Sequence, residues 1–225
     1  MPKETIIISL GGSLVAPNDI DTGFLKVFKK TVVKFLDSKK FFIIVGGGKI
    51  WRNYQKALLE FGADNKERDL VGIEVSRLNA KVVRQMFSEI AFSEIITNPT
   101  KKISTKKDIV VGGGWKPGWS TDYCSVMLAK NMGIKTIVNL TNIDYVFDKD
   151  PNKFKNAKAI KEITWKDFRK IVPDKWTPGL SAPFDPIASR MAEILKIKVL
   201  MVNGKHLERL ENFLNNKAFT GTTIQ

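Results

Sequence analysis

Short runs of apolar and β-branched residues recur along the chain, separated by longer segments in which apolar residues return at helical spacing. The runs have the usual length of strands and cover Thr5–Leu10, Phe41–Val45, Ile109–Val111, Thr136–Asn139 and Val199–Val202. Strands that alternate with helices favour a mostly parallel sheet covered by helices. We therefore predict an α/β fold.

Two segments show the helical pattern most clearly, each with Lys and Arg on its other faces. Their apolar positions are Phe24, Val27, Phe28, Thr31, Val32 and Phe35 in one, and Leu70, Ile73, Leu78, Val82 and Phe87 in the other. We expect both stripes to face the core, but we do not expect one domain of 225 residues to bury the stripe at 24–35 completely, which favours a homo-oligomer. The lysine-rich stretch 97–107 is expected to be a loop. Neither a linker nor an internal repeat is visible, so residues 1–225 are predicted to form a single domain.

Composition and charge exclude several classes of protein. The 225 residues are 43% hydrophobic and 27% charged, which is too apolar for a disordered chain and enough for a sizeable core. The formal net charge is +14, and residues 1–112 and 113–225 each carry an excess of seven positive charges. Because no basic arm or patch stands out, we expect no nucleic acid partner. An even excess suits the steering of anionic substrates.

The chain has one cysteine, Cys124, and one histidine, His206. These are too few for an intrachain disulfide or a zinc-type cluster, so we predict no metal-ligating residue. The apolar run at residues 6–10 is too short for a secretory signal and ends in glycine. No later run approaches the roughly 18 apolar residues that would span a bilayer. We expect a cytoplasmic protein without a membrane partner.

Glycines and hydroxyl residues gather at the carboxyl ends of the predicted strands. The first four strands lead into Gly11-Gly12-Ser13, into Gly46-Gly47-Gly48-Lys49, into Gly112-Gly113-Gly114 with Ser120-Thr121-Asp122 beyond it, and into Thr141-Asn142-Ile143-Asp144. Such loops converge on one edge of a parallel sheet, where ligands bind. Glycine lets backbone N–H groups approach a phosphate closely, and hydroxyls add donors. The pattern predicts nucleotide or polyphosphate binding.

Several well-known classes are excluded. The glycine run at 46–50 lacks the spacing and the Ser or Thr of a Walker A motif, and no G-x-G-x-x-G opens a helix after a strand. The protein-kinase signatures are absent. His206, which lies in a predicted surface turn, leaves Ser–His–Asp hydrolysis unsupported.

Seven segments together resemble a known family over nearly the whole chain. They are ISLGGSL (8–14), VGGGKIWRNY (45–54), DLVGIEVSRLNA (69–80), GGWKPGWSTD (113–122), TNIDYVFDKDP (141–151), FDPIASRMA (184–192) and GTTI (221–224). The sequence resembles the amino-acid kinase family, and within it the archaeal-type uridylate (UMP) kinases. Isopentenyl phosphate kinases are similar only up to the glycines and then carry a histidine-bearing continuation that this chain lacks.

The resemblance implies a three-layer sandwich with a central, mostly parallel sheet. It implies a nucleoside-monophosphate half at roughly residues 1–135 and an ATP half at roughly 136–225. It further implies transfer of the γ-phosphoryl group of ATP to UMP in pyrimidine nucleotide biosynthesis, with Mg²⁺ as cofactor, and a homo-oligomer, in particular a hexamer. The attacking oxygen of the UMP phosphate is already an anion, so the missing histidine base suits this chemistry.

The same resemblance gives roles to individual residues. Those implied to bind ATP are Gly12, Ser13, Gly48, Arg52, Thr141, Asn142, Phe147 and Asp150. Those implied to bind UMP are Gly47, Asp69, Trp115, Lys116, Pro117, Gly118, Trp119, Ser120 and Thr121. The implied catalytic residues are Lys49, Arg52 and Asp122. Asp69, expected at the start of a helix, would accept hydrogen bonds from the ribose, and Asp122 would orient charged groups. Helix capping is the alternative role of each.

The chain departs from the family pattern at three places. The strand-one lysine of the bacterial relatives is missing, with Ser9 nearest, so Lys49, Arg52 or Lys116 is expected to supply the charge. On the adenine side, Tyr145 stands where the family has glycine and Phe147 where it has tyrosine. In the acceptor loop, two tryptophans could stack on uracil, shield it from water or bury against another subunit.

Two other functions stay open at this point. One is a kinase of the same fold with another acceptor, such as isopentenyl phosphate, acetylglutamate or carbamate. The other is a non-catalytic, nucleotide-binding storage or regulatory protein, because a fold does not determine a function.

Overall fold

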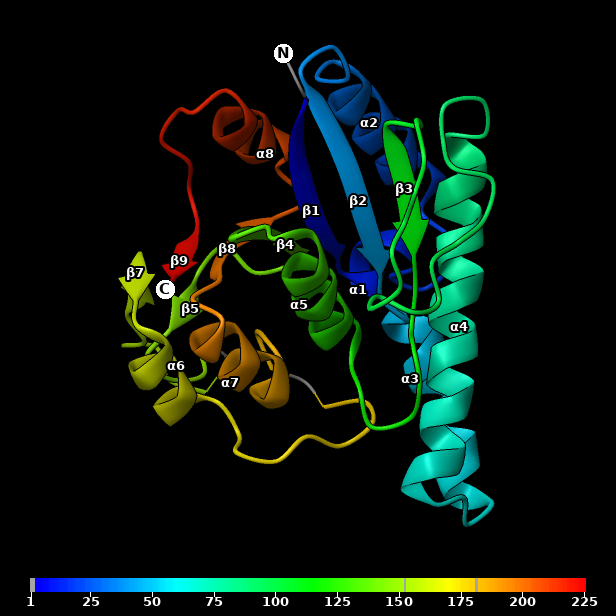
Figure 1. Ribbon diagram of the computed structural model, residues 1–225. Coiled ribbons are helices and arrows are strands. Elements are labelled where there is room, and N and C mark those ends of the chain that lie inside the picture. Colours follow the sequence, from blue (N-terminus) through cyan, green and yellow to red (C-terminus); the bar gives the residue numbers. More distant parts are fainter. Residues whose placement is uncertain (1–2, 152, 181) are drawn as a thin grey trace.

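The computed structural model describes residues 3–151, 153–180 and 182–225, and a seven-stranded sheet forms its centre (Figure 1). The strand order is β3-β2-β1-β4-β8-β9-β7. The strands are β1 (Glu4–Leu10), β2 (Lys39–Val45), β3 (Ile109–Gly112), β4 (Thr136–Thr141), β7 (Glu162–Ile163), β8 (Lys198–Asn203) and β9 (Thr222–Ile224). A separate two-stranded sheet pairs β5 (Val146–Phe147) with β6 (Ala159–Ile160).

Five neighbouring strands, from β3 to β8, run parallel to one another, and β9 and β7 at the far edge run the opposite way. Leu10 at the end of β1 lies beside Val45 of β2 and Leu140 of β4. The central strands therefore end at the same level. As a consequence, the loops that follow them lie together at one edge of the sheet.

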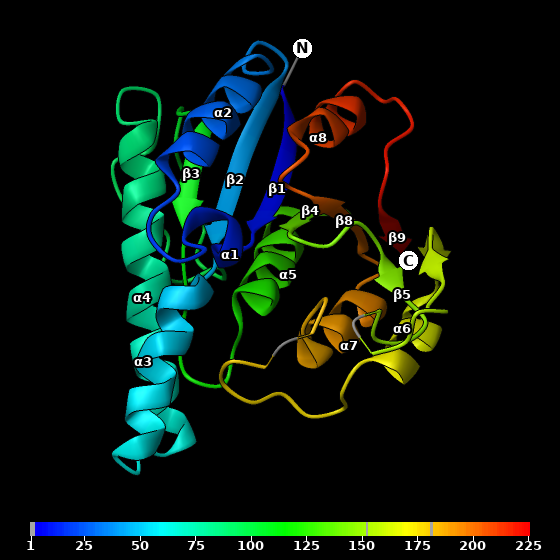
Figure 2. The ribbon, with the colours of Figure 1, turned by 180° about the vertical axis from the view of Figure 1, so that it is seen from behind.

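Helices cover both faces of the sheet (Figures 1 and 2). One core cluster includes side chains of α1 (Gly12–Val15), α2 (Thr22–Val33), α4 (Asn65–Met86) and α8 (Leu207–Leu214). The other includes α5 (Thr121–Met132), α6 (Trp165–Ile171) and α7 (Pro186–Ile194). Side chains alternate along β1, with Ile6 and Ile8 in the first cluster and Ile7 in the second. The predicted α/β fold with three layers is confirmed.

All five predicted strands are confirmed, and each extends one or two residues beyond its predicted bounds. The short strands β5, β6, β7 and β9 are not predicted from the sequence, because two or three residues are too few to show an alternation. The stretch 97–107 contains no helix or strand, as expected.

The predicted helix at residues 24–35 exists as α2, but its stripe is only partly in the core. Phe28 and Val32 are buried, whereas Val27 is 53% exposed. Phe35 lies beyond the end of the helix at Val33. The stripe therefore faces the core at Phe28 and Val32 and is left incompletely buried at Val27, as expected for a single domain of this size.

The second predicted helix, α4, is paired with α3 (Gly48–Glu60) in a helical hairpin that extends past the carboxyl ends of the strands (Figure 1). Ile73 of its stripe is buried, but Leu70 and Leu78 are 46% and 61% exposed. These two leucines were expected in the core, and that expectation is wrong.

The loops after β1 and β2 pack backbone against backbone. A Cβ on Gly12 would lie 2.2 Å from the amide nitrogen of Gly48 and 2.5 Å from the carbonyl oxygen of Gly46. Asn79 of α4 donates its side-chain amide to the carbonyls of Gly46, over 2.9 Å, and Gly47, over 3.1 Å. Only glycine at position 12 permits this approach.

We expect Gly12→Ala to lower the free energy of unfolding by more than about 2 kcal/mol, because the added methyl group meets backbone atoms that cannot rotate away. Denaturant titration followed by circular dichroism measures this loss. Gly23→Ala in the first turn of α2 is the matched control, since its Cβ would meet only the Asp21 carboxylate, at 3.3 Å. A Gly12→Ala protein as stable as the control would contradict the packing.

Candidate active site

A cavity of about 190 Å³ lies at the carboxyl edge of the sheet, walled by residues of α3, α4, α5 and the loop that precedes α7. Eight of its lining residues are predicted site residues, namely Gly47, Gly48, Arg52, Asp69, Trp119, Ser120, Thr121 and Asp122. The others are Trp51, Gly72, Ile73, Ser76, Gly114, Trp176, Pro178, Gly179, Leu180, Ala182 and Asp185. We call this space the first cavity.

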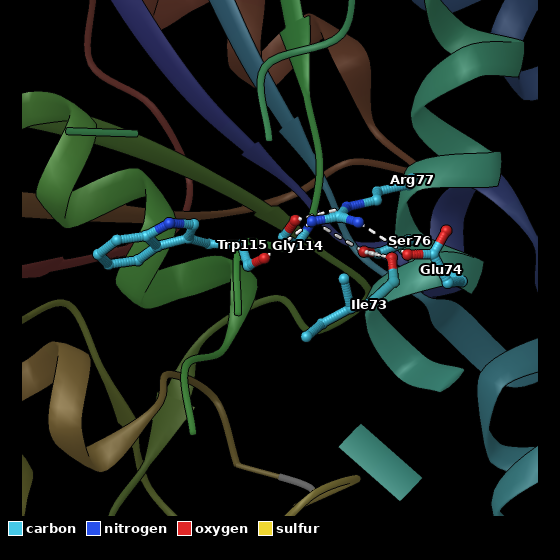
Figure 3. A network of polar contacts seen from close by, with 6 residues as sticks. All are labelled: Ile73, Glu74, Ser76, Arg77, Gly114 and Trp115. Atoms are coloured by element: carbon cyan, nitrogen blue, oxygen red, sulfur yellow. Dashed lines mark hydrogen bonds and ion pairs between the residues drawn. The ribbon is translucent and has the colours of Figure 1, made fainter. Parts of the chain in front are cut away.

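Helix α4 holds the loop after β3 in place (Figure 3). The Arg77 guanidinium donates to the carbonyls of Gly114, over 3.0 Å, and Trp115, over 2.8 Å. The same guanidinium pairs with Glu74 over 2.7 Å. The Ser76 hydroxyl accepts the Gly114 N–H over 2.8 Å. The loop is thereby held where it borders the first cavity.

Asp69 projects from α4 and contacts the same loop. Its buried carboxylate accepts the Gly118 N–H over 2.6 Å. Burial raises the pKa of Asp69, and this hydrogen bond opposes the rise. The expectation that Asp69 starts a helix is wrong, because α4 begins at Asn65 and is capped by Asp64 and Glu67 in a capping box. Capping is therefore not the role of Asp69.

Three aromatic rings stack beside the first cavity. The ring centroids of Trp115 and Trp119 lie 6.5 Å apart, and those of Trp119 and Tyr123 lie 4.0 Å apart with 19° between the ring planes. The Lys116 ammonium lies 4.2 Å from the centroid of the Trp115 ring. Only Trp119 of these lines the first cavity. Of these three rings, Trp119 is therefore the one that a ligand in the first cavity can contact.

Asp122 lies in the first turn of α5 but does not cap it. The cap is Ser120, whose hydroxyl accepts the Tyr123 N–H over 3.1 Å. The Asp122 carboxylate accepts the Ser9 hydroxyl over 3.1 Å and the backbone N–H of Asp185 over 3.2 Å. The side chain of Asp122 is thus directed to β1 and to the start of α7, and the capping alternative is wrong.

Asp122 and Asp185 are two carboxyl groups with no ion-pair partner among the described residues. Burial and the charge of Asp185 raise the pKa of Asp122 to about 7, against hydrogen bonds from Asp185 and Ser9. Burial raises the pKa of Asp185 to about 6, against hydrogen bonds at the start of α7 and the nearby Ser120 hydroxyl. No Lys or Arg side chain lowers either pKa. Both negative charges are therefore uncompensated.

The loop between α6 and α7 reaches across to α3. Gln55 of α3 donates its side-chain amide to the carbonyl of Pro178 over 2.5 Å. Gly179, with φ of +78°, lies directly against Gln55, where a Cβ would be 2.0 Å from its Oε1. Trp176 and Leu180 of this loop line the first cavity. The hydrogen bond from Gln55 therefore connects α3 to the loop between α6 and α7 beside the first cavity.

A second cavity, of about 390 Å³, adjoins the first, and Ala182 lines both. Four residues predicted to bind ATP lie together in its wall, namely Thr141, Asn142, Phe147 and Asp150. Tyr145, one of the departures from the family pattern, lines it as well. The two cavities separate the residues predicted for UMP from those predicted for the nucleoside of ATP.

The remaining predicted residues lie outside both cavities. Gly12 is enclosed by the neighbouring glycine backbone, and Ser13 lines a groove with residues of α2 and α8. Lys49 donates to the Asn18 side chain over 2.6 Å. Trp115, Lys116, Pro117 and Gly118 belong to the loop but do not line either space. Of the three cations expected to replace the missing lysine, only Arg52 lines the first cavity.

Several residues of the wall are not predicted as site residues from the sequence. Trp51 and Asp185 lie inside segments that carry the family resemblance, so the motifs contain the information needed to find them. Trp51 packs over Gly47 and Gly72, where an added Cβ would come within 2.8 and 3.0 Å of it. Trp176 lies outside these segments, and only folding places it at the site.

Within residues 3–151, 153–180 and 182–225, no group of three or more His, Cys, Asp or Glu side chains is arranged to hold a metal ion. In the same part of the chain, no helix has both the length and the apolar character needed to cross a membrane.

Glycine loops after parallel strands, together with two adjoining cavities at one edge of the sheet, define a nucleotide-binding α/β protein with room for two ligands. The chain belongs to the amino acid kinase family, whose model matches residues 4–203.

Similar proteins cover nearly the whole chain. The uridylate kinase of Methanobrevibacter smithii is 32% identical over 222 residues, which are 97% of this chain and 98% of that protein. The uridylate kinase of Pyrococcus abyssi is 32% identical over 224 residues, 98% and 99% of the two chains. The crystal structure of uridylate kinase from Archaeoglobus fulgidus superposes with a TM-score of 0.81 at 28% identity, covering 98% of this chain and 99% of that one.

In metal-free buffer, we expect the free energy of unfolding to fall as the pH rises from about 4 to about 7. Because the raised pKa values make the native state hold protons at Asp122 and Asp185 more tightly than the unfolded chain does, ionisation over this range favours unfolding. Asp122→Asn should flatten the slope. Denaturant titrations at a series of pH values measure it.

The control for this measurement is Asp144→Asn. Hydrogen bonds from Arg209 and Asn203 lower the pKa of Asp144, so it titrates below the range of interest and the variant should keep the wild-type slope. An unchanged slope in Asp122→Asn would show that this carboxyl keeps an ordinary pKa.

Proposed function

We propose that this protein is a uridylate kinase, which transfers the γ-phosphoryl group of ATP to UMP and yields UDP and ADP, a step of pyrimidine nucleotide biosynthesis. The uridylate kinases that it resembles match it over nearly its whole length. The observation that carries the proposal is the pair of adjoining cavities with Ala182 between them. A phosphoryl transfer needs two nucleotides held with their phosphates facing each other.

UMP occupies the first cavity in this proposal. Its phosphate meets the starts of α3 and α5, where Gly47, Ser120 and Thr121 line the wall and helix N-termini favour an anion. Asp69 accepts a hydrogen bond from the ribose, and Trp119 contacts the base. The rest of the loop, residues 115–118, acts by holding Trp119 in place.

ATP binds with its nucleoside in the second cavity, against Thr141, Asn142, Phe147 and Asp150. Its phosphates extend past Ala182 into the first cavity, toward Gly48. Gly12 acts indirectly in this arrangement, by allowing the Gly48 loop to approach β1.

The chemistry requires charge neutralisation and positioning, not a base. The attacking oxygen of the UMP phosphate is already an anion. Arg52 is the one Lys or Arg side chain of the described residues that lines the first cavity, and it neutralises the transferring group. A magnesium ion bound with ATP neutralises phosphate charge, and the buried, unpartnered Oδ2 of Asp185 is an oxygen that suits such an ion.

An acceptor panel with ATP, followed as ADP release, tests the proposal. We expect UMP to be preferred over CMP and dUMP, and no release above background with isopentenyl phosphate, acetylglutamate or carbamate. In Asp69→Ala, the KM for UMP should rise far more than that for ATP, because a lost hydrogen bond to a charged group costs on the order of 1.5–3 kcal/mol.

Asp64→Ala is the matched control for the Asp69 variant, since Asp64 caps the same helix and does not line the first cavity. It should lose stability and keep both KM values. Equal rises of both KM values in Asp69→Ala would assign Asp69 to loop positioning through Gly118. A better acceptor than UMP would refute the uridylate kinase assignment, and no turnover with any acceptor would favour a nucleotide-binding protein without catalysis.

We further propose that the protein acts in the cytoplasm as a homo-oligomer, in particular a hexamer. Support comes from exposed apolar side chains on the α3–α4 hairpin and the turn that joins its helices. They are Tyr54, Leu59, Phe61, Leu70 and Leu78, with Phe61 at the turn 83% exposed. Apolar surface gathered on one element is typical of a protein contact.

Light scattering at micromolar concentration should give about six times the 25.3 kDa of one chain. Leu78→Glu on α4 should reduce this mass, because it places a charge on the exposed apolar face. Ile194→Glu is the control, since Ile194 is 73% exposed and belongs to α7, which lies apart from the hairpin in both ribbon views. A wild-type mass of 25.3 kDa would end the proposal.

A further inference from the structure

The loop between α6 and α7 runs from these two helices toward the α3–α4 hairpin (Figures 1 and 2). We call its residues 174–180 the crossing loop. Four of them line the first cavity, namely Trp176, Pro178, Gly179 and Leu180. The structure describes every residue of this segment, and none of them lines the second cavity. The crossing loop therefore forms part of the wall around one ligand and not around both.

The crossing loop is attached to α7 at its first residue. The Arg190 guanidinium of α7 donates to the Asp174 carbonyl over 3.1 Å. Within the loop, the Leu180 N–H donates to the Thr177 carbonyl over 3.0 Å and closes a turn. Neither of these two bonds reaches the α3–α4 hairpin, so a further contact is needed to hold the loop against it.

Gln55 of α3 provides that contact. Its side-chain amide donates to the Pro178 carbonyl over 2.5 Å. Pro178 is buried, and because proline has no N–H, this carbonyl is its only polar backbone group. A buried carbonyl without a partner is costly, so the bond from Gln55 stabilises the loop in this position.

The next residue of the loop packs its backbone against the same amide. Gly179 has a φ of +78°, which other residues rarely adopt, and a Cβ there would overlap the Gln55 side chain. The crossing loop thus contacts Gln55 twice, through a hydrogen bond at Pro178 and through close backbone packing at Gly179.

Gln55 belongs to the face of α3 that borders the first cavity. Gly48, Trp51 and Arg52 line this cavity. Together with Gln55 they occupy positions i, i+3, i+4 and i+7 of the helix, which share one face. None of the residues of α3, all of which the structure describes, is fully buried. Contacts along its surface therefore fix this helix, and the crossing loop makes one of them.

We infer that Gln55 is a positioning residue, whose amide holds the crossing loop across the first cavity and so completes the binding site of the acceptor. The inference rests on the proposed function, which places the acceptor nucleotide in this cavity. Gln55 itself lines neither cavity. Its effect on the acceptor is transmitted by the four loop residues that line the first cavity. The competing account is a surface contact without influence on binding.

Hydrogen exchange of the nucleotide-free protein, followed by mass spectrometry, tests the contact itself. We expect the backbone amides of the crossing loop to exchange at least about fivefold faster in Gln55→Met than in the wild type. Met has nearly the length of Gln but carries neither a strong donor nor a charge, so the variant removes the bond to Pro178 and adds no repulsion.

Lys56→Ala is the matched control. Lys56 follows Gln55 on α3, is exposed and lines neither cavity. The crossing loop of this variant should exchange as it does in the wild type.

Steady-state kinetics separate a positioning role from a general effect on α3. Gln55→Met should raise the KM for UMP at least about fivefold and change the KM for ATP by less than about twofold. The two substrates differ because the crossing loop lines the first cavity alone. Disturbance of α3 itself would raise both KM values, since this helix begins at Gly48, toward which the ATP phosphates extend. Lys56→Ala should keep both values.

A double-variant cycle tests the packing at Gly179. Gly179→Ala introduces a methyl group that overlaps the Gln55 amide, and we expect it to raise the KM for UMP in the wild-type background. In the Gln55→Ala background that space is free, so the same change should raise the KM by a smaller factor. The backbone strain of Ala at this φ is present in both backgrounds and cancels. Equal factors in the two backgrounds would contradict the contact.

Unchanged exchange of the crossing loop in Gln55→Met would overturn the inference. Faster exchange with both KM values at the wild-type level would also refute it, as would equal rises of the two. The exchange experiment requires neither substrate nor turnover, and another acceptor found in the panel would replace UMP in the kinetics. Faster exchange in a protein without turnover would leave the loop contact established and refute the uridylate kinase assignment, so the two failures are distinguishable.

Discussion

The backbone contact between the loops after β1 and β2 is the constraint on which the site depends. Because Gly12 has no side chain, the Gly48 amide and the Gly46 carbonyl lie in the space that a Cβ would fill. This contact sets the start of α3 against the central strand. Asn79 connects the same loop to α4, and Arg77 of α4 in turn holds the loop after β3. Three of the four loops at the carboxyl edge are thus linked through one helix.

The protein has a positive net charge, but its first cavity contains two buried acidic groups. The chain carries a net charge of +14, which attracts anionic nucleotides from a distance. At the first cavity, however, two buried carboxyl groups face the position proposed for the phosphates. Two nucleotides bring further negative charge, and Arg52 alone cannot neutralise all of it. The magnesium ion proposed to bind with ATP would reconcile the carboxylates with the phosphates, because its positive charge offsets both.

The candidate site is formed by residues that lie far apart in the sequence. The wall of the first cavity includes residues from both of the halves expected from the resemblance, for example Asp69 and Asp122 before position 135 and Trp176 and Asp185 after it. The hydrogen bond from Gln55 to Pro178 joins segments 123 positions apart. Ala182 belongs to both cavities, which makes the loop before α7 the border between the two proposed nucleotide sites.

The sequence by itself determined the parallel strands, the glycine loops at their ends and the family, because alternation, helical spacing and loop chemistry are local properties of the chain. It also placed Thr141, Asn142, Phe147 and Asp150 in one group, which the second cavity contains. Only the tertiary structure decided that Lys49 bonds to Asn18 outside the first cavity. It also decided that Trp176 joins the wall and that Asp185 meets Asp122. Such contacts depend on how helices and loops far apart in sequence pack in space, and no local pattern encodes that packing.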